Sequence, residues 1–224
     1  MLVCGIDEAG RGPVIGPLVM AGVLVEEGDI EKLKAIEVKD SKLVTPKRRE
    51  MLFKKIINIC RDYRILVIEP SEIDNAVNGH DGLNLNRLEA VKTAEIIDSL
   101  NPDKAIIDAP SNNIQAYTRY VKGLLNNKEV ELVAEHKADV KYPSVSAASI
   151  LAKVTRDNEI KRIQEKINEP IGSGYPADPI TAKFLEHNYD KHPEIFRKSW
   201  ASHRNAVNKK FQRQLTGFDE FIEQ

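Results

Sequence analysis

The chain contains few cysteines and no cysteine motif typical of a metal or redox site. Only Cys4 and Cys60 occur among 224 residues, and they do not form a C-x-x-C pair. Both are interpreted as buried free thiols in a reducing compartment. A basic leader is also missing, and the apolar stretch 13–25 is too short to cross a bilayer. The chain is therefore predicted to be cytoplasmic.

An excess of either charge is missing as well. The chain holds 33 Lys and Arg against 34 Asp and Glu, a net charge of -1. Global charge thus gives no argument for a nucleic-acid partner, and such an argument has to rest on local patches. With 42% hydrophobic and 30% charged residues, a proper core can form and wholesale disorder is not expected. The length suits one domain with an appendage, or two small domains.

What the chain does contain is an apolar, strand-like start followed by two carboxylates and a glycine-rich turn. Asp7 and Glu8 come where the first strand should end, directly before Gly10-Arg11-Gly12. Carboxylates beside flexible backbone can seat a hard divalent cation, and glycine lets backbone N–H groups approach a ligand. A solvated acidic pair before a tight turn is an equally good interpretation. Since successive strand side chains point to opposite faces, Asp7 and Glu8 can share a site only if the strand stops or bulges between them.

A dinucleotide-binding turn fits this stretch less well. Glycines 10, 12 and 16 are one residue off the G-x-G-x-x-G fingerprint. Pro13 and Pro17 oppose a helix that starts there, and the acidic pair would repel a pyrophosphate.

The remaining pattern predicts an α/β fold. Strands are expected over 18–25, 63–68, 105–108 and 130–133, and helices over 45–60, 71–76, 85–100, 111–125 and 146–167, with further helices from 178 and 193. This order predicts a mixed five-stranded sheet flanked by helices, antiparallel at the front and parallel behind. A break at 172–176 divides the chain into residues 1–175 and a helical C-terminal extension, residues 176–224.

The segment 197–213 carries basic residues and no acid. Its charged members are Arg197, Lys198, Arg204, Lys209, Lys210 and Arg213. Trp200 and Phe211 are interleaved, which is typical of a nucleic-acid groove. A solvated basic helix face explains the same pattern and is preferred if nothing else indicates nucleic acid.

Four carboxylates follow or lie near apolar strands: Asp7, Glu8, Asp108 and Asp139. If the strands are neighbours in the sheet, these side chains meet at one spot. Such a cluster repels itself unless a divalent metal neutralises it. Oxygen-only ligands favour Mg²⁺ or Mn²⁺ over zinc.

At this point the sequence resembles the type 2 ribonucleases H (ribonuclease HII), and its short opening and undivided chain are archaeal-like. The matching runs are DEAGRGP at 7–13, DSK at 40–42, IDA at 107–109, HKAD through SAAS at 136–149, and GSGYP at 172–176. They occur in the family's order and cover most of the chain up to about residue 180. The first and fourth runs are long and specific.

The resemblance implies a ribonuclease H-like catalytic domain over 1–175 and a substrate-binding extension over 176–224. It implies a metal-dependent endoribonuclease that hydrolyses the RNA strand of RNA–DNA hybrids and cuts 5′ of single ribonucleotides in duplex DNA. The expected products are a 5′-phosphate and a 3′-hydroxyl, formed by a mechanism with two Mg²⁺ or Mn²⁺ ions. The implied roles are those of an enzyme in DNA replication and ribonucleotide excision repair.

The resemblance also assigns residues. Asp7, Glu8, Asp108 and Asp139 match the family's metal-binding and catalytic carboxylates. The resemblance further implies three substrate-binding elements. The loop Gly10, Arg11 and Gly12 reads the ribose and the RNA-to-DNA junction. Ser41 and Lys42 contact phosphate, and Tyr175 stacks at the junction. The 2′-OH is the group that distinguishes RNA from DNA, so a backbone reader fits this chemistry.

Other polar residues near these runs are given ordinary roles. Asp40 is as well explained by a turn as by a ligand role, and Lys153 and Arg156 are expected to face solvent. Asp157 is a rival for the fourth carboxylate, and Asp139 is preferred on motif position.

The C-terminal tail QRQLTGFD at 212–219 resembles the box that binds a sliding clamp. Gln212, Leu215 and Phe218 occupy its positions, while Asp219 replaces its final aromatic residue. The alternative is a frayed amphipathic end. Two other functions stay open: a junction resolvase of the same fold, which needs no 2′-OH, and a hybrid-binding protein without catalysis.

Overall fold

The computed structural model describes residues 1–36, 38, 45–79, 83–209 of the chain. One five-stranded sheet forms its centre, with strand order β3-β2-β1-β4-β5. The strands are β1 (Leu2–Ala9), β2 (Leu18–Glu26), β3 (Asp62–Ile68), β4 (Lys104–Asp108) and β5 (Glu131–Glu135). β1, β2 and β3 pair antiparallel, and β1, β4 and β5 pair parallel. The predicted mixed sheet is confirmed.

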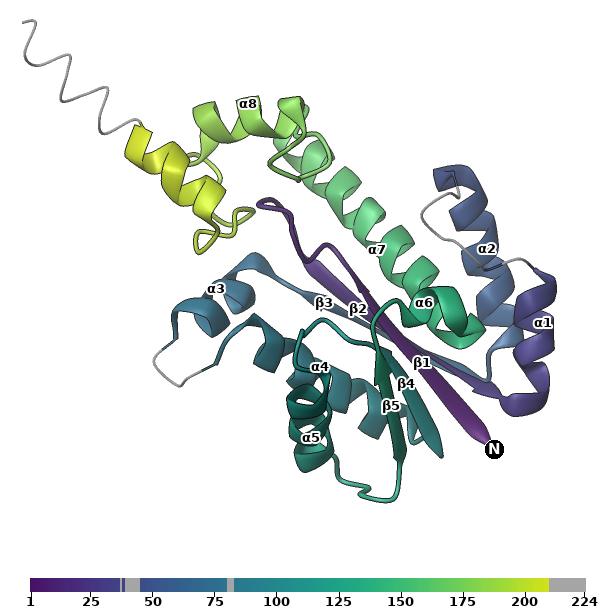
Figure 1. Cartoon of the computed structure of the whole chain (residues 1–224). Coiled ribbons are helices and arrows are strands. Elements are labelled where there is room, and N and C mark those ends of the chain that lie inside the picture. The colour runs from purple at the N-terminus through teal and green to yellow at the C-terminus, as the bar shows by residue number, and fades with distance from the viewer. Residues whose placement is uncertain (37, 39–44, 80–82, 210–224) are drawn as a thin grey trace, which may run out of the picture.

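Helices cover both faces of the sheet (Figure 1). One side carries α1 (Ile30–Ala35), which follows the short 3-10 helix η1 (Glu27–Asp29), α2 (Pro46–Ile59), α6 (Ala138–Lys141) and the long α7 (Pro143–Ile167). The other side carries α3 (Pro70–Asn78), α4 (Leu85–Leu100) and α5 (Ile114–Leu124). Beyond them come α8 (Pro179–Asn188) and a helical stretch over 201–209.

Alternation along β1 divides the core into two layers. Val3 and Ala9 pack with the residues of α7, whereas Cys4 and Ile6 pack with those of α4. At Gly5 the helix α7 passes so close that a Cβ would lie 2.2 Å from the carbonyl carbon of Ser144. Because only glycine leaves this room, α7 lies directly on the strand that carries the acidic pair.

Local signals set several of the helix boundaries. Thr45 caps α2 by accepting a hydrogen bond from Arg48 N, and Asp178 caps α8 by accepting one from Ile180 N. Two of the predicted starts are wrong. Asn113, not Ser111, caps α5. Pro193 lies in a turn, and the helix begins only at residue 201.

A third apolar cluster joins the turn after β1 to the C-terminal part of the chain. Ile15 packs with Ile160 of α7 and with Phe184 and Phe196 further along. Ile15 also pairs with Phe196 in an isolated antiparallel bridge. The boundary between residues 175 and 176 stays a prediction, but residues from both sides of it hold the glycine-rich loop.

Candidate active site

Three carboxylates from separate parts of the chain meet at the end of the sheet. β1 and β4 are parallel and pair Ile6 with Ile107, so Asp7 and Asp108 leave the same edge. Asp139 comes from α6, which follows β5. One carboxylate oxygen from each of Asp7, Asp108 and Asp139 lies within 4.8 Å of the others. Asp7 and Asp139 are buried, and Ala138 N donates to Asp108 Oδ1 over 3.1 Å.

The electrostatics of this group favour a bound cation. Burial, and to a smaller extent the charge of Asp108, raises the pKa of Asp7 to about 7, against the effects of a hydrogen bond from Ser149 and the charge of Lys153. A cation bound between the three side chains would favour the ionised form of Asp7. Their oxygen-only donor set fits Mg²⁺ or Mn²⁺.

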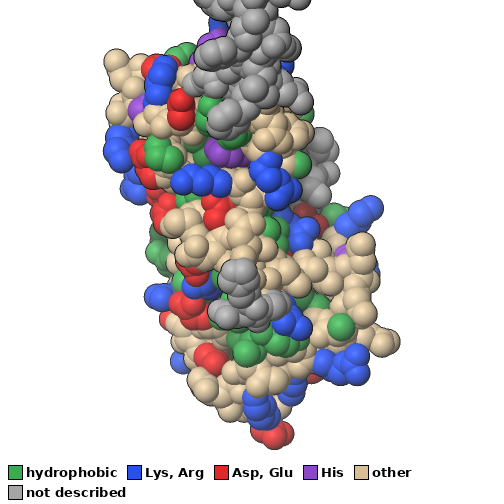
Figure 2. All heavy atoms as spheres, turned by 90° about the vertical axis from the view of Figure 1, so that its left-hand side faces the viewer, with side chains coloured by type: hydrophobic (Ala, Val, Ile, Leu, Met, Phe, Trp, Pro, Cys, Tyr) green, Lys and Arg blue, Asp and Glu red, His purple; other side chains and the backbone are tan. Residues whose placement is uncertain are grey.

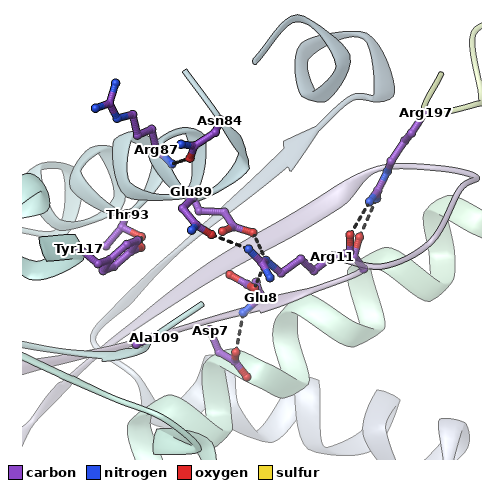
Figure 3. A network of polar contacts seen from close by, with 12 residues as sticks. Asp7, Glu8, Arg11, Asn84, Arg87, Glu89, Thr93, Ala109, Tyr117 and Arg197 are labelled. Atoms are coloured by element: carbon purple, nitrogen blue, oxygen red, sulfur yellow. Dashed lines mark hydrogen bonds and ion pairs between the residues drawn. The ribbon is translucent and has the colours of Figure 1, made fainter. Parts of the chain in front are cut away.

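Glu8 lies on the opposite face of β1. The strand neither stops nor bulges between Asp7 and Glu8, because its pairing continues without interruption from Asp7 with Ala21 to Ala9 with Val19. Figure 3 shows Asp7 on the α7 side of the strand and Glu8 on the other side, next to Arg11. The expected meeting of four side chains at one spot is therefore a meeting of three, although Glu8 lines the same cleft.

The surroundings of Glu8 are also crowded with charge. Burial, followed by the nearby Glu89 and Asp7, raises the pKa of Glu8 well above its usual range, while Arg11 acts in the other direction. Glu8 Oε1 lies 3.7 Å from Arg11 Nε.

The Gly10-Arg11-Gly12 loop forms one wall of the cleft. Gly10 has φ of +86°, and a Cβ there would lie 2.3 Å from Arg156 Cδ. Only glycine therefore fits this position without strain. Gly12 is exposed and faces the ring of Tyr175, since a Cβ on Gly12 would lie 3.6 Å from Tyr175 Cε1.

The carbonyl groups of this loop are held by the C-terminal segment. The Arg197 guanidinium donates to Gly10 O over 2.6 Å, to Arg11 O over 3.0 Å and to Gly16 O over 3.0 Å. Trp200 Nε1 donates to Gly12 O over 3.1 Å. All three carbonyls of the loop are thus engaged from one side.

Arg197 is fully buried, so the expected basic groove over 197–213 is wrong at its first residue. Burial, and next the nearby Arg156, lowers the pKa of Arg197 to about 9. The part of that segment beyond residue 209 lies outside the described residues.

On the face drawn in Figure 2, basic and acidic side chains are interspersed, in keeping with the balanced composition.

Two basic residues of α7 line the cleft instead of facing solvent, which corrects the expectation for both. Arg156 is buried, donates to Ser173 O over 3.0 Å and lies 5.1 Å over the ring of Tyr175. Lys153 donates to Ser149 Oγ over 2.9 Å. Both side chains bring positive charge to a wall that faces the acidic group.

The structure distinguishes between the two candidates for the last carboxylate: Asp139 belongs to the carboxylate group, and Asp157 does not. Asp157 accepts from Arg49 Nη2 over 2.9 Å at the cleft wall and is not part of the carboxylate group. Asp40, Ser41 and Lys42 lie outside the described residues, as do the tail residues Gln212, Leu215 and Phe218. Their predicted roles stay predictions.

Glu89 and Arg197 were not among the candidates from sequence. Glu89 is buried in α4 and accepts from Arg11 Nε over 2.8 Å (Figure 3). Its sequence signal is weak: it is seven residues before Ile96, so it shares the buried face of the helix. No signal in the basic run set Arg197 apart from its neighbours.

In the part of the chain that the structure describes, no helix has the length and apolarity that crossing a membrane requires.

The chain was compared with known proteins. The family described as Ribonuclease HII matches residues 4–203. Ribonuclease HII of Pyrococcus furiosus is 46% identical over 229 residues, covering 99% of each chain. Among solved structures, ribonuclease H2 from Pyrococcus horikoshii OT3 is 44% identical with a TM-score of 0.85, covering 93% of this chain and 98% of that one.

A second similar solved structure is a complex of two proteins. It is the PCNA:RNase HII complex from Archaeoglobus fulgidus, 39% identical with a TM-score of 0.80, covering 89% of this chain and 95% of that one. The match in sequence and the match in fold agree over nearly the whole length. The chain therefore belongs to the ribonuclease HII family and is a hydrolytic ribonuclease of the ribonuclease H class.

Proposed function

We propose that this enzyme hydrolyses the RNA strand of RNA–DNA hybrids and cuts 5′ of single ribonucleotides in duplex DNA, leaving a 5′-phosphate and a 3′-hydroxyl. The single observation that carries the proposal is the meeting of Asp7, Asp108 and Asp139 beside the Gly10–Gly12 loop and Tyr175 in one cleft. Acidic ligands and a ribose-reading wall in one cleft are what hydrolysis at a ribonucleotide requires.

We assign the metal-holding role to Asp7, Asp108 and Asp139, and to Glu8 from the neighbouring wall. When held by these residues, two Mg²⁺ or Mn²⁺ ions would supply activation of a water and stabilisation of the leaving oxygen. Lys153 and Arg156, on the same cleft, bring positive charge toward a phosphodiester.

The Gly10–Gly12 loop and Tyr175 read the substrate. The carbonyls of Gly10, Arg11 and Gly12 are bonded to Arg197 and Trp200, which leaves the other edge of the loop backbone for a ribose. A 2′-OH both donates and accepts hydrogen bonds, so such a loop can distinguish RNA from DNA. Tyr175 is 41% exposed and backed by Arg156, which suits a ring that stacks at the junction.

The test uses DNA duplexes that carry zero, one or four ribonucleotides, with and without Mg²⁺ or Mn²⁺. We expect cleavage only where a ribonucleotide and a metal are both present, with a 5′-phosphate on one side of the nick and a 3′-hydroxyl on the other, the two ends that a ligase can rejoin. Cleavage of the duplex without ribonucleotides would favour a junction resolvase. Binding without any cleavage would favour an inert hybrid-binding protein.

We also propose that the C-terminal tail binds the sliding clamp through Gln212, Leu215 and Phe218. The support is the tail sequence together with the Archaeoglobus fulgidus relative, whose solved structure is a PCNA complex. Such binding would bring the enzyme to replicated DNA.

The free thiols Cys4 and Cys60 agree with our prediction of a cytoplasmic location.

The clamp proposal is tested by deleting residues 212–224 and measuring clamp affinity by surface plasmon resonance. We expect binding to fall below detection while cleavage of a short duplex is retained. A double variant, Leu215→Ala with Phe218→Ala, should behave as the deletion does, and Glu223→Gln is the control. Unchanged affinity in the deletion contradicts the proposal.

A further inference from the structure

Glu89 is a carboxylate in an apolar setting that the proposed reaction does not use. It is fully buried in α4, next to Leu88 and Ala90, which belong to the core. A buried charge costs several kcal/mol unless it is paired. Glu89 Oε1 is paired with Arg11, while Glu89 Oε2 is buried without a hydrogen-bond partner among the described residues.

Arg11 lies between two glutamates. Its Nε is 2.8 Å from Glu89 Oε1 and 3.7 Å from Glu8 Oε1. Its Nη2 donates to Asn86 Oδ1 over 2.6 Å, and Asn86 is one turn before Glu89 on the same helix. Figure 3 shows the guanidinium turned toward Glu89, with Glu8 beside it. The side chain therefore binds α4 more closely than it binds β1.

The backbone of Arg11 is held in place by hydrogen bonds from the C-terminal segment. Arg197 holds the carbonyls of Gly10 and Arg11, and Trp200 holds that of Gly12. Asp74 in turn fixes the segment that carries Arg197, because Asp74 accepts hydrogen bonds from Lys198 N and Ser199 N. Only the side-chain torsions of Arg11 are left to select between Glu89 and Glu8.

We propose that Glu89 is a positioning residue that keeps Arg11 away from Glu8, so that the Glu8 carboxylate stays available to a divalent cation. This inference rests on the proposed function, which assigns Glu8 to the metal. Without Glu89, the nearest carboxylate to Arg11 is Glu8, and an arginine–carboxylate pair can form with two hydrogen bonds. That pair competes with the cation for the same oxygens.

The experiment measures Mn²⁺ binding to the full chain without nucleic acid, by the electron paramagnetic resonance signal of free Mn²⁺. Glu89→Met removes both acceptor oxygens at similar volume. We expect it to weaken Mn²⁺ binding by about 10-fold, the scale seen when a group that orients a metal ligand is lost. Glu89→Gln keeps one acceptor for Arg11 and should weaken binding less, and it serves if Glu89→Met does not fold.

The decisive variant is the double substitution Glu89→Met with Arg11→Met. If Arg11 is the competitor, its removal restores Mn²⁺ affinity to the wild-type value or above it. A double variant as weak as Glu89→Met alone overturns the proposal, because the loss then comes from the core and not from Arg11. Glu95→Gln is the matched control, since Glu95 is on the same helix but exposed and paired with Lys92.

Glu8→Gln separates this proposal from the function on which it rests. If Glu8→Gln leaves Mn²⁺ affinity unchanged, the metal role of Glu8 is wrong and the role of Glu89 falls with it. If Glu8→Gln weakens binding while Glu89→Met and Glu89→Gln do not, only the role of Glu89 is overturned.

Discussion

Asp7 and Glu8 are adjacent on one strand but lie in different electrostatic surroundings. Asp7 faces α7, where it meets Asp108 and Asp139. Glu8 faces α4, where Arg11 lies between it and Glu89. On the α7 side three carboxylates lie together with Lys153 nearby, whereas on the α4 side an arginine is hydrogen-bonded directly to one of the two glutamates. Two consecutive acidic residues can therefore face two different environments when the strand that carries them continues through both.

The two sides also differ in how they are held. On the α7 side, the acidic residues stand on β1, β4 and α6, close to the sheet. On the α4 side, the loop carrying Arg11 is held by Arg197, 186 residues further along. The arrangement on the α7 side thus depends on the sheet, and the arrangement on the α4 side depends on the C-terminal segment.

The largest effect is expected from a substitution in the carboxylate group on the α7 side. Asp7→Asn removes one charge from the group that we propose to hold the metal, and a catalytic metal ion typically contributes several kcal/mol to transition-state stabilisation. We expect kcat/KM on a duplex with one ribonucleotide to fall by about 1000-fold or more, with hybrid binding retained. Steady-state cleavage assays and a binding titration measure this. Asp157→Asn, in the same cleft but paired with Arg49, is the control and should change kcat/KM by less than about 10-fold.

A smaller effect is expected from breaking the support of the α4 side. Arg197→Met leaves the carbonyls of Gly10, Arg11 and Gly16 without their donor. We expect the free energy of unfolding to fall by about 3 kcal/mol, measured by urea denaturation. Lys198→Met, at an exposed neighbour, should change it by less than about 0.5 kcal/mol. An equal loss in both variants would show that the segment is stabilised in another way.

The pH dependence of stability distinguishes the two sides further. The folded-state pKa of Asp7, about 7, lies above its ordinary value of 3.8, so its protonation stabilises the fold fully below pH 3.8. That contribution is lost as pH rises through 7. In EDTA, the stability of Asp7→Asn relative to wild type should therefore grow by about 4 kcal/mol between pH 4 and pH 8, because folding raises the pKa of Asp7 from 3.8 to about 7. A constant difference in denaturation measurements across this range would contradict the assignment.

The smallest effect concerns the hydrogen bond from Ser149 to Asp7. This bond favours the ionised carboxylate, so Ser149→Ala should raise the pKa of Asp7 further. We expect Mn²⁺ affinity at pH 6 to fall by about threefold, which corresponds to the loss of one modest hydrogen bond. The loss should shrink at pH 9, where Asp7 is ionised in both proteins. Titrations at the two pH values check this.

Much of the fold could be predicted from local pattern. The helix over Leu85–Leu100 was predicted with its observed bounds, because apolar residues recur at helical spacing between clear boundaries. Within this helix the apolar Val91 is 36% exposed, while Ala90, Thr93 and Ala94 are buried. The pattern indicated the helix better than it indicated which side of the helix faces the core.

The acidic site was predictable in part. Asp7 and Asp108 each follow a run of apolar strand residues, and the strands proved to be parallel neighbours, so these two could be placed together. The position of Glu8 depended on whether β1 continued past Asp7, which local sequence left open. The burial of Arg197 and Glu89 depended on partners 187 and 78 residues away. No short window of sequence contains both members of such a pair.

The sequence by itself determined the strands, most helices, the acidic residues at strand ends and the glycine-rich loop, because propensity, periodicity and turn chemistry act between near neighbours. The tertiary structure decided which face each acid occupies, which arginines are buried and which glutamate Arg11 binds. These outcomes follow from burial and charge, and both depend on which distant segments pack together.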